Sequence, residues 1–277
     1  MTPAEYCQDK AAQSGSSFYY SFLFLPKQRR EAITALYAFC REVDDIADEC
    51  TDPAIAQIKL EWWRQELGRT FADQPGHPVS QALLPAIRRY GLAQEQLAEI
   101  IDGMEMDLQY VRYPDFKALQ LYCYRVAAVV GQLAAAIFGY SERSTLKYAH
   151  DLGIAFQLTN IIRDVGEDAQ RNRIYLPQDE LLQFGVAESD ILAGRSSPEL
   201  QALLAYQTKR AQHFYQQAMH ELPQADRRSQ RPGLVMAAIY QAVLTEIARD
   251  NFPVLKHRVS LTPIRKLWLA WRTWVFS

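Results

Sequence analysis

The chain has 277 residues, of which 49% are apolar and 12% aromatic, and its formal net charge is −2. This length can bury a large core, and no Gly/Pro/Ser-rich linker divides the chain into separate domains. A nearly neutral balance excludes the broad basic footprint of a nucleic-acid-binding protein, so we expect no nucleic-acid partner.

The four cysteines have no CxxC or other metal-binding spacing, which predicts reduced thiols in a cytoplasmic protein. They are Cys7, Cys40, Cys50 and Cys123. The first residues include Glu5, Asp9 and Lys10 and hold no apolar signal-peptide core. The longest apolar run, 126–140, is too short to cross a bilayer. We therefore expect a cytoplasmic protein, soluble or peripheral at the inner face of the membrane.

In chain order, Thr2-Pro3-Ala4-Glu5 is a capping box with proline at the first helical position, which predicts a short helix at once. A long helix is expected from Lys27 to Glu49, ahead of the Asp52-Pro53 start of the next one. Further helices are expected at about 53–72, 79–90, 93–111, 115–138, 142–169, 178–184, 198–222 and 232–251. No run alternates apolar and polar residues, so the chain is predicted to be all-α.

Two of these helices carry acidic stripes. In the first helix, the residues that share one face through spacings of three and four are Tyr37, Arg41, Asp44 and Asp48. In the helix at 142–169, the corresponding residues are Gln157, Asn160, Asp164 and Asp168. Both stripes lie among apolar residues, and burying carboxylates costs free energy unless a cation or a wet cavity compensates. The pattern favours one cavity between two facing helices over two solvated helix ends.

Carboxylate and amide oxygens are the ligands that Mg²⁺ prefers, and Mg²⁺ often shares its coordination shell with substrate phosphates. Two diphosphates carry roughly −6 and the acidic stripes about −4 more, and three Mg²⁺ supply about +6. Part of the rest could be absorbed by Arg41, Arg173 and Arg258, so the charges point to a diphosphate substrate. The apolar surroundings suit a prenyl tail: 15 carbons are worth on the order of 10 kcal/mol gross when buried, before the cost of association.

These residues resemble the squalene/phytoene synthase family across essentially the whole chain. The stretches that carry the resemblance are 14–26, 37–48, 102–108, 126–131, 157–168 and 172–177, together with Tyr240. Within the family, the opening segment and Tyr122-Cys-Tyr-Arg-Val126 are most similar to the branch that makes presqualene diphosphate for hopanoids. Arg125 and Ala128 depart from the glycines of carotenoid-forming relatives, at a point where helix backbone lies close to substrate.

The resemblance implies a single-domain isoprenoid-synthase helical bundle, 1–277, with a central cavity. It also implies head-to-head (1′-1) condensation of two farnesyl diphosphates to presqualene diphosphate, with Mg²⁺ and without NADPH for this step. The product would pass to a downstream enzyme that processes presqualene diphosphate. Phytoene, squalene and dehydrosqualene stay open as products, as do head-to-tail elongation and terpene cyclisation. The family also includes non-catalytic assembly factors, which tend to lose the acidic residues that this chain keeps.

The resemblance also assigns roles by position. The Mg²⁺ ligands on the two diphosphates would be Asp44 and Asp48 on one, and Asn160, Asp164 and Asp168 on the other. The phosphate oxygens would be contacted by Arg41, Arg173 and Arg258. The reaction centre would be lined by Tyr37, Tyr175, Tyr240 and Gln157. Ser14 and Ser17 would lie near the phosphate end.

The tail from 256 to 277 combines basic residues with Trp268, Trp271 and Trp274 at spacings of three. This pattern suits an interfacial contact with a membrane. It suits equally a helix that docks on its own core, and the sequence leaves both interpretations open.

Overall fold

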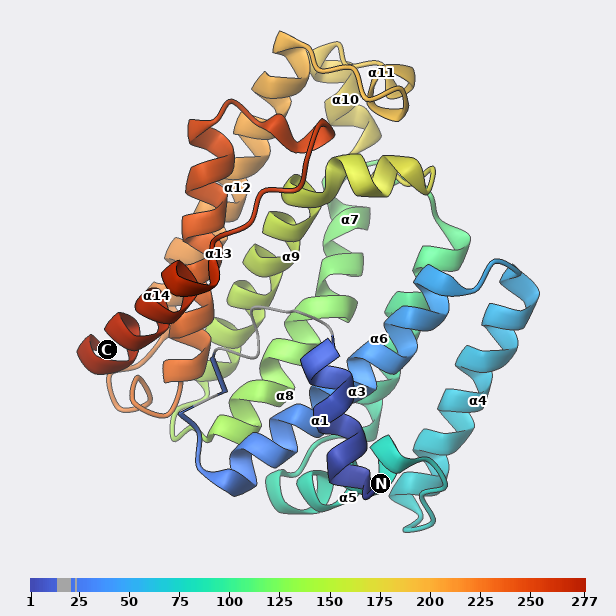
Figure 1. Ribbon diagram of the computed structural model, residues 1–277, viewed down its shortest axis with the longest axis vertical. Helices are drawn as coiled ribbons and strands as arrows, with labels where there is room; N and C mark the ends of the chain where they lie inside the picture. Colours follow the sequence, from blue (N-terminus) through green and yellow to red (C-terminus); the bar gives the residue numbers. More distant parts are fainter. Residues whose placement is uncertain (14–20, 23) are drawn as a thin grey trace.

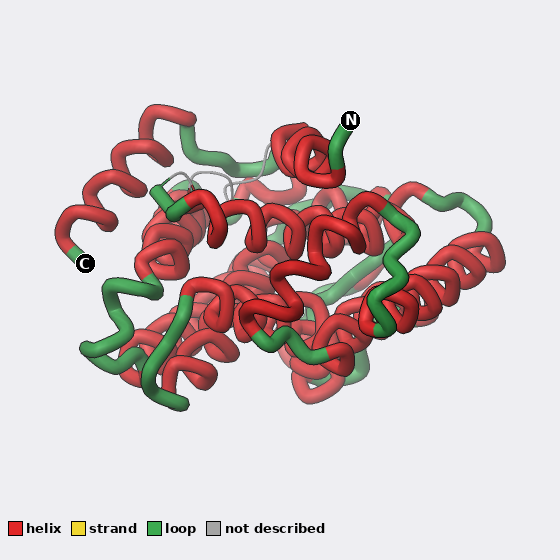
Figure 2. Tube along the Cα trace, turned by 90° about the horizontal axis from the view of Figure 1, so that it is seen from below, coloured by secondary structure: helices red, strands yellow, loops and turns green. Residues whose placement is uncertain are grey.

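The computed structural model describes residues 1–13, 21–22 and 24–277. In these ranges the regular structure is helical, and the only β-type pairing is an isolated bridge between Arg112 and Ile174 (Figures 1 and 2). Ser14 and Ser17 lie outside the described residues. The all-α prediction is confirmed.

The helices are α1 (Pro3–Gln13), α3 (Lys27–Glu49), α4 (Pro53–Phe71), α5 (Pro78–Tyr90), α6 (Gln94–Gln109), α7 (Phe116–Cys123), the π-helix η1 (Tyr124–Ala128), α8 (Val129–Phe138), α9 (Ser144–Gln170), α10 (Gln178–Phe184), α11 (Glu188–Leu192), α12 (Pro198–Glu221), α13 (Arg231–Arg249), the 3₁₀ helix η2 (Pro253–Leu255) and α14 (Pro263–Phe276).

The local signals for helix starts act as expected. The Glu5 backbone N–H donates to Thr2 Oγ1 at 3.3 Å, and the Thr2 nitrogen donates to Glu5 Oε2 at 2.7 Å. The Asp52 side chain accepts from the Ala54 N–H at 2.9 Å and caps α4. One prediction was incomplete. The helix expected at 115–138 is interrupted by η1, a wider π turn of the kind often found at functional sites.

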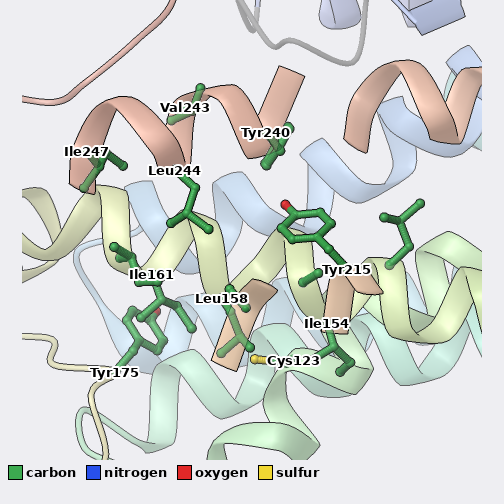
Figure 3. Close-up of a cluster of buried hydrophobic side chains, with 14 of the residues drawn as sticks. Cys123, Ile154, Leu158, Ile161, Tyr175, Tyr215, Tyr240, Val243, Leu244 and Ile247 are labelled. Atoms are coloured by element: carbon green, nitrogen blue, oxygen red, sulfur yellow. The ribbon is translucent and has the colours of Figure 1, made fainter. Parts of the chain in front are cut away.

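Two apolar cores build the molecule. One surrounds α9 and draws side chains from α7, α12 and α13. Figure 3 shows part of it, with Ile154, Leu158 and Ile161 of α9 packed beneath Tyr240 and Leu244 of α13. The other core surrounds α3 and draws on α1, α4, α5 and α6. Helix α8 contributes to both cores, so α3 and α9 face each other across the boundary between them.

The stretch 116–138 forms one continuous helical segment, longer than the apolar run at 126–140. By length and composition alone it could cross a bilayer, with a mean hydropathy of 1.6. In this fold it is a core element, because Leu119, Val129 and Leu133 are buried against other helices.

Close backbone contact fixes how α9 crosses this segment. A Cβ at Gly153 of α9 would lie 2.6 Å from both Ala127 O and Ala128 Cα, and a Cβ at Gly131 would lie 2.5 Å from Ala149 O. Both glycines also line the central cavity. Because Gly131 and Gly153 have no side chains, α9 can lie close to η1 and α8. This close packing fixes the position of this part of the cavity wall.

Candidate active site

A cavity of about 830 Å³ lies between α3 and α9. Its wall includes every predicted site residue that the structure describes. These are Tyr37, Arg41, Asp44, Asp48, Gln157, Asn160, Asp164, Asp168, Arg173, Tyr175, Tyr240 and Arg258. The two acidic stripes therefore share one hollow.

The first stripe lies near the C-terminal end of α3, which has no basic residue in its last turn. A carboxylate at the C-terminal end of a helix interacts unfavourably with the helix macrodipole, so Asp44 and Asp48 do not stabilise α3 through the macrodipole. Arg41 pairs with Asp44, with Nη1 and Oδ2 separated by 2.5 Å, and it also pairs with Asp45. Asp45 turns away toward α1, where Lys10 Nζ lies 2.8 Å from its Oδ2. Asp44 and Asp48 are thus the carboxylates of α3 that face the cavity.

The second stripe occupies about the last four turns of α9. Asn160 Nδ2 donates to Gln157 Oε1 at 3.2 Å. Asp164 accepts from Arg163 Nε at 2.7 Å and lies 2.9 Å from Arg258 Nε, which reaches in from the C-terminal segment. The side chains on this wall are thus held by partners from two parts of the chain.

Arg173 ties the two stripes together. It follows α9 directly, after Asn172, whose φ of 58° turns the chain back toward α3. Its Nη1 donates to Asp48 Oδ1 at 2.8 Å, and its Nη2 donates to Ala47 O at 2.9 Å. Arg171 adds a second contact, 2.9 Å from Asp48 Oδ2. These bonds bring the acidic ends of α3 and α9 to the same mouth of the cavity.

A buried carboxylate that the stripe pattern did not identify sits between them. Asp107 of α6 is 6% exposed, and it accepts from Tyr122 Oη at 2.8 Å and from Tyr175 Oη at 2.7 Å. The rings of Tyr122 and Tyr175 stack with centroids 5.2 Å apart. The sequence held a signal, because Asp107 is an acidic residue directly after Met106 on the apolar side of its helix. That signal lies on α6, whose regularly spaced acidic residues do not include Asp107; they are Glu95, Glu99, Asp102 and Glu105.

Further basic residues of the wall were also missed. They are Arg163, Arg171 and Lys266. Arg163 lies about 100° round the helix from Asp164, so spacing excluded it. Its long side chain nevertheless folds back onto that carboxylate, and such reach is not readable from a helical wheel.

The departures at Arg125 and Ala128 lie outside the wall of this cavity, whose nearest lining residues are Val126 and Ala127. Arg125 Nε donates to Glu99 Oε2 at 2.9 Å, and Ala128 is fully buried. The glycine that meets Ala128 is Gly153 on α9. Arg125 and Ala128 therefore do not narrow the cavity. At Ala128 the helices pack closely because the glycine is on α9, as Gly153.

Counted formally, with every side chain ionised, the described part of the cavity wall is balanced in charge. Its six acidic residues are Asp44, Asp48, Asp107, Asp164, Glu167 and Asp168, and its six basic residues are Arg41, Arg163, Arg171, Arg173, Arg258 and Lys266. Acidic and basic side chains lie against one another, so ligands that enter must bring their own compensating charge.

The acidic residues sit where the charged form is costly. Burial raises the pKa of Asp168 to about 8, with contributions from Asp164 and Asp107. Burial likewise raises the pKa of Asp44 to about 7, against the opposing effect of Arg41. The pKa of Asp107 is raised to about 6 by burial, although two tyrosines donate to it. Carboxylates held this way favour a proton or a metal cation close by.

The donor set fits Mg²⁺. Asn160 Oδ1 is buried and has no hydrogen-bond partner among the residues that the structure describes, and a buried acceptor of this kind suits a cation or a bound ligand. Asp164 and Asp168 follow it at one-turn intervals on the same face. Among the described residues, no three His, Cys, Asp or Glu side chains form a ready-made metal cage.

An all-helical bundle with two acidic helix ends on one amphiphilic cavity suits a ligand that has both a charged group and an apolar tail. Comparison with known proteins identifies the site further. The model of the squalene/phytoene synthase family matches residues 11–265, and the chain belongs to that family. The family is of the prenyltransferase type, and its enzymes condense two prenyl diphosphates head to head.

Individual relatives agree on the family. The chain is 35% identical to 15-cis-phytoene synthase of Synechococcus elongatus, over 95% of this chain and 89% of the relative. It is 34% identical to chloroplastic phytoene synthase 1 of Arabidopsis thaliana, over 94% of this chain and 63% of the relative. Among solved structures, squalene synthase HpnC from Alicyclobacillus acidocaldarius superposes with a TM-score of 0.81 at 28% identity, covering 90% of this chain and 94% of that one. A dehydrosqualene synthase with bound ligand superposes with a TM-score of 0.87 at 27% identity, covering 99% and 96%.

Proposed function

We propose that this chain catalyses the Mg²⁺-dependent head-to-head condensation of two allylic prenyl diphosphates. The observation that carries the proposal is the single cavity onto which both acidic helix ends open. One diphosphate would lie against Asp44 and Asp48, and the other against Asn160, Asp164 and Asp168. A site for one substrate would need only one of these walls.

Charge supports the same conclusion. Because the wall holds six acidic and six basic residues, two diphosphates at roughly −6 need about +6 from outside, which three Mg²⁺ supply. When bound, these ions stabilise diphosphate as a leaving group and so favour cleavage of the allylic C–O bond. Arg41, Arg173 and Arg258 would add charge-assisted hydrogen bonds to phosphate oxygens.

The rest of the wall is suited to the prenyl chains. Its apolar part includes Phe22, Ile33, Leu36, Met104, Val126, Val130, Ala134 and Phe138. This lining shields the reaction from water, which would otherwise trap an allylic cation as an alcohol. The faces of Tyr37 and Tyr240 lie on the same cavity, where an aromatic ring can stabilise passing positive charge.

The chain's own residues then assist bond formation. The 2,3-double bond of one prenyl group attacks C1 of the other once its diphosphate has left, and a proton is lost as a cyclopropane closes. Tyr175 and Tyr122 hold their hydroxyls on Asp107, at the end of the cavity where the carboxylates meet. A tyrosine hydroxyl so placed can relay that proton to the departed diphosphate.

The chain length of the substrate is a separate question. The names of the phytoene synthase relatives favour two geranylgeranyl diphosphates and phytoene as the product. The motif at Tyr122–Val126 favours the farnesyl branch, in which presqualene diphosphate would be released for a downstream enzyme. The likeness to a squalene synthase and a dehydrosqualene synthase supports a C15 substrate as the second candidate. Neither phytoene nor presqualene diphosphate requires NADPH.

The test is incubation of the purified protein with farnesyl or geranylgeranyl diphosphate and Mg²⁺, with and without NADPH, followed by mass spectrometry of the products. A C40 or C30 head-to-head product is expected, and its chain length and reduction state decide between the candidates. Asp164→Ala should lower kcat/KM by about 100-fold or more. The matched control is Asp190→Ala, an acidic residue on α11 outside the cavity. Absence of any product with both substrates would overturn the proposal.

A further inference from the structure

Helix α14 presents an apolar stripe to the outside of the molecule. Its members are Ile264, Leu267, Trp268, Trp271 and Val275, each between 45% and 81% exposed. At 100° per residue, these positions fall within an arc of about 100°, so they form one face rather than scattered contacts. Figures 1 and 2 both place this helix at the margin of the molecule, beside the C-terminus.

One side of α14, next to the stripe, is anchored on the rest of the molecule. Ala270 is fully buried, and Trp274 packs against Phe24 with ring centroids 5.1 Å apart. Arg231 lies over the Trp274 ring and donates to Ser277 O at 2.8 Å. The three tryptophans of the tail therefore fall into two groups. Trp274 docks on the core, whereas Trp268 and Trp271 point outward.

The charged side chains of the C-terminal segment itself all have one sign. From residue 251 to 277 the chain has no Asp or Glu and five Lys or Arg, although the whole protein carries −2. Arg265 is paired with Glu246 at 2.8 Å. Arg272, beside the stripe, lies over the Trp268 ring at 5.0 Å. An outward face of tryptophan and aliphatic side chains flanked by arginine is complementary to anionic lipid headgroups above an acyl layer.

The same segment continues into the cavity wall. Arg258, Val259, Ser260 and Leu261, just before α14, line the cavity, and so does Lys266 on its inner side. If α14 lay on a lipid layer, the part of the cavity wall formed by residues 258–261 and Lys266 would therefore lie next to that layer.

We propose that α14 is an interfacial helix that docks this protein on the surface of an anionic lipid bilayer, with Trp268 and Trp271 inserted at the level of the headgroups. Exposure and charge, and not the reaction, mark this face as a membrane surface. Vesicle binding is measured without substrate. Membrane docking can therefore fail while the catalytic proposal stands, and catalysis can fail while membrane docking stands.

The experiment is co-flotation of the full chain with vesicles of phosphatidylcholine alone or mixed with phosphatidylglycerol. We expect binding to the anionic vesicles that weakens with salt. Trp268→Ser/Trp271→Ser should lower the partition coefficient by about tenfold or more. Arg272→Gln should lower it by about fivefold on anionic vesicles and little on neutral ones. Point substitutions are preferred to truncation because Trp274 supports the core.

The matched control is Ile58→Ser/Trp62→Ser, which removes two exposed apolar side chains, 69% and 41% exposed, from one face of α4. It should leave vesicle binding unchanged. Circular dichroism melting verifies that each variant is folded. Equal loss in both double variants would overturn the proposal, as would full binding by the α14 variant. A dimer in light scattering that the α14 substitutions dissociate, without vesicle binding, would show that a second copy covers this face and would also overturn it.

Discussion

Asp107 is a buried carboxylate whose two hydrogen-bond donors, Tyr122 and Tyr175, come from α7 and from the turn after α9. It therefore joins three parts of the chain at one point. Hydrogen bonds to a charged group each contribute about 1.5–3 kcal/mol to stability. Because this side chain also lines the cavity, the same contacts position the hydroxyls that face the reaction.

Removing these bonds should therefore lower stability by a predictable amount. Tyr175→Phe and Tyr122→Phe are each expected to lower the free energy of unfolding by about 1.5–3 kcal/mol. Tyr110→Phe is the control, because that side chain is 50% exposed at the end of α6, and its loss should cost less than about 0.5 kcal/mol. Urea unfolding measures all three. Equal small effects would show that the hydroxyls on Asp107 add nothing to stability.

The residue scale also shows what sequence can predict of the site. Helical spacing correctly predicted that Asp44, Asp48, Asp164 and Asp168 line one cavity. It could do so because the face on which a residue lies depends only on its own helix. Asp107 was out of reach of that argument, since its importance comes from tyrosines 15 and 68 residues away. The distances from Arg173 to Asp48 were likewise unpredictable, because they depend on where a turn aims a long side chain.

At the scale of elements, α9 is held at its N-terminal end by a distant carboxylate. Asp226 accepts from Ser141 N–H at 2.8 Å, Ser141 Oγ at 2.7 Å, Glu142 N–H at 3.0 Å and Thr145 Oγ1 at 2.7 Å. A negative charge here also complements the helix macrodipole. This anchoring matters because the other end of α9 carries the carboxylates of the cavity, which the macrodipole disfavours.

Asp226 makes stability depend on pH. Burial would raise its pKa, but the hydrogen bonds from Ser141 and Thr145 outweigh this and lower the pKa to about 2. A carboxyl with a lower pKa when folded stabilises the fold above its unfolded pKa, near 3.9. That stability is lost as pH falls from about 4 toward 2. Asp226→Asn should flatten the fall of the melting temperature in this window.

The matched cap is Asp52, which makes a single bond to the N–H of Ala54. Asp52→Ala should cost about 1 kcal/mol. Asp226→Ala should cost about 2–4 kcal/mol, because it leaves several donors unpaired. A cost at Asp226 no larger than that at Asp52 would contradict this account of α9.

The crossing of α9 and η1 gives a second prediction for an element. Gly153→Ala should destabilise the protein by about 1–3 kcal/mol, because its Cβ would meet backbone atoms of Ala127 and Ala128 that cannot move aside. Gly68→Ala, within α4 with no atom in reach of its Cβ, should instead stabilise by about 0.5–1 kcal/mol. Thermal denaturation of both variants provides the comparison. Two changes of the same sign would mean that close packing does not distinguish these sites.

The order of the helices was largely predictable, because proline and capping residues mark their starts. Pro26 precedes α3 and Asp52 caps α4, and both act over a few residues. The π turn in η1 was not predictable, since none of its five residues is a proline or a glycine. The short α11 was missed because five residues carry too little periodicity.

At the scale of the whole molecule, the balance of charges decides which ligands bind. Six acidic and six basic side chains line the cavity, so Mg²⁺ alone adds uncompensated positive charge and diphosphate alone adds negative charge. Each should bind weakly by itself, and the two together should bind strongly. Metal and diphosphate are therefore expected to act as linked ligands of one site.

Thermal shift measurements with inorganic diphosphate and MgCl₂ test this linkage. At about 100 times the dissociation constant, a ligand raises stability by about 2.7 kcal/mol, which corresponds to roughly 5–10 °C in Tm for a chain of this size. We expect that rise only with both ligands present. Asp48→Asn/Asp168→Asn should abolish it, whereas Asp190→Asn on α11 should retain it. If diphosphate alone gave the full shift, the arginines would be its binding partners, and the acidic walls would not be metal ligands.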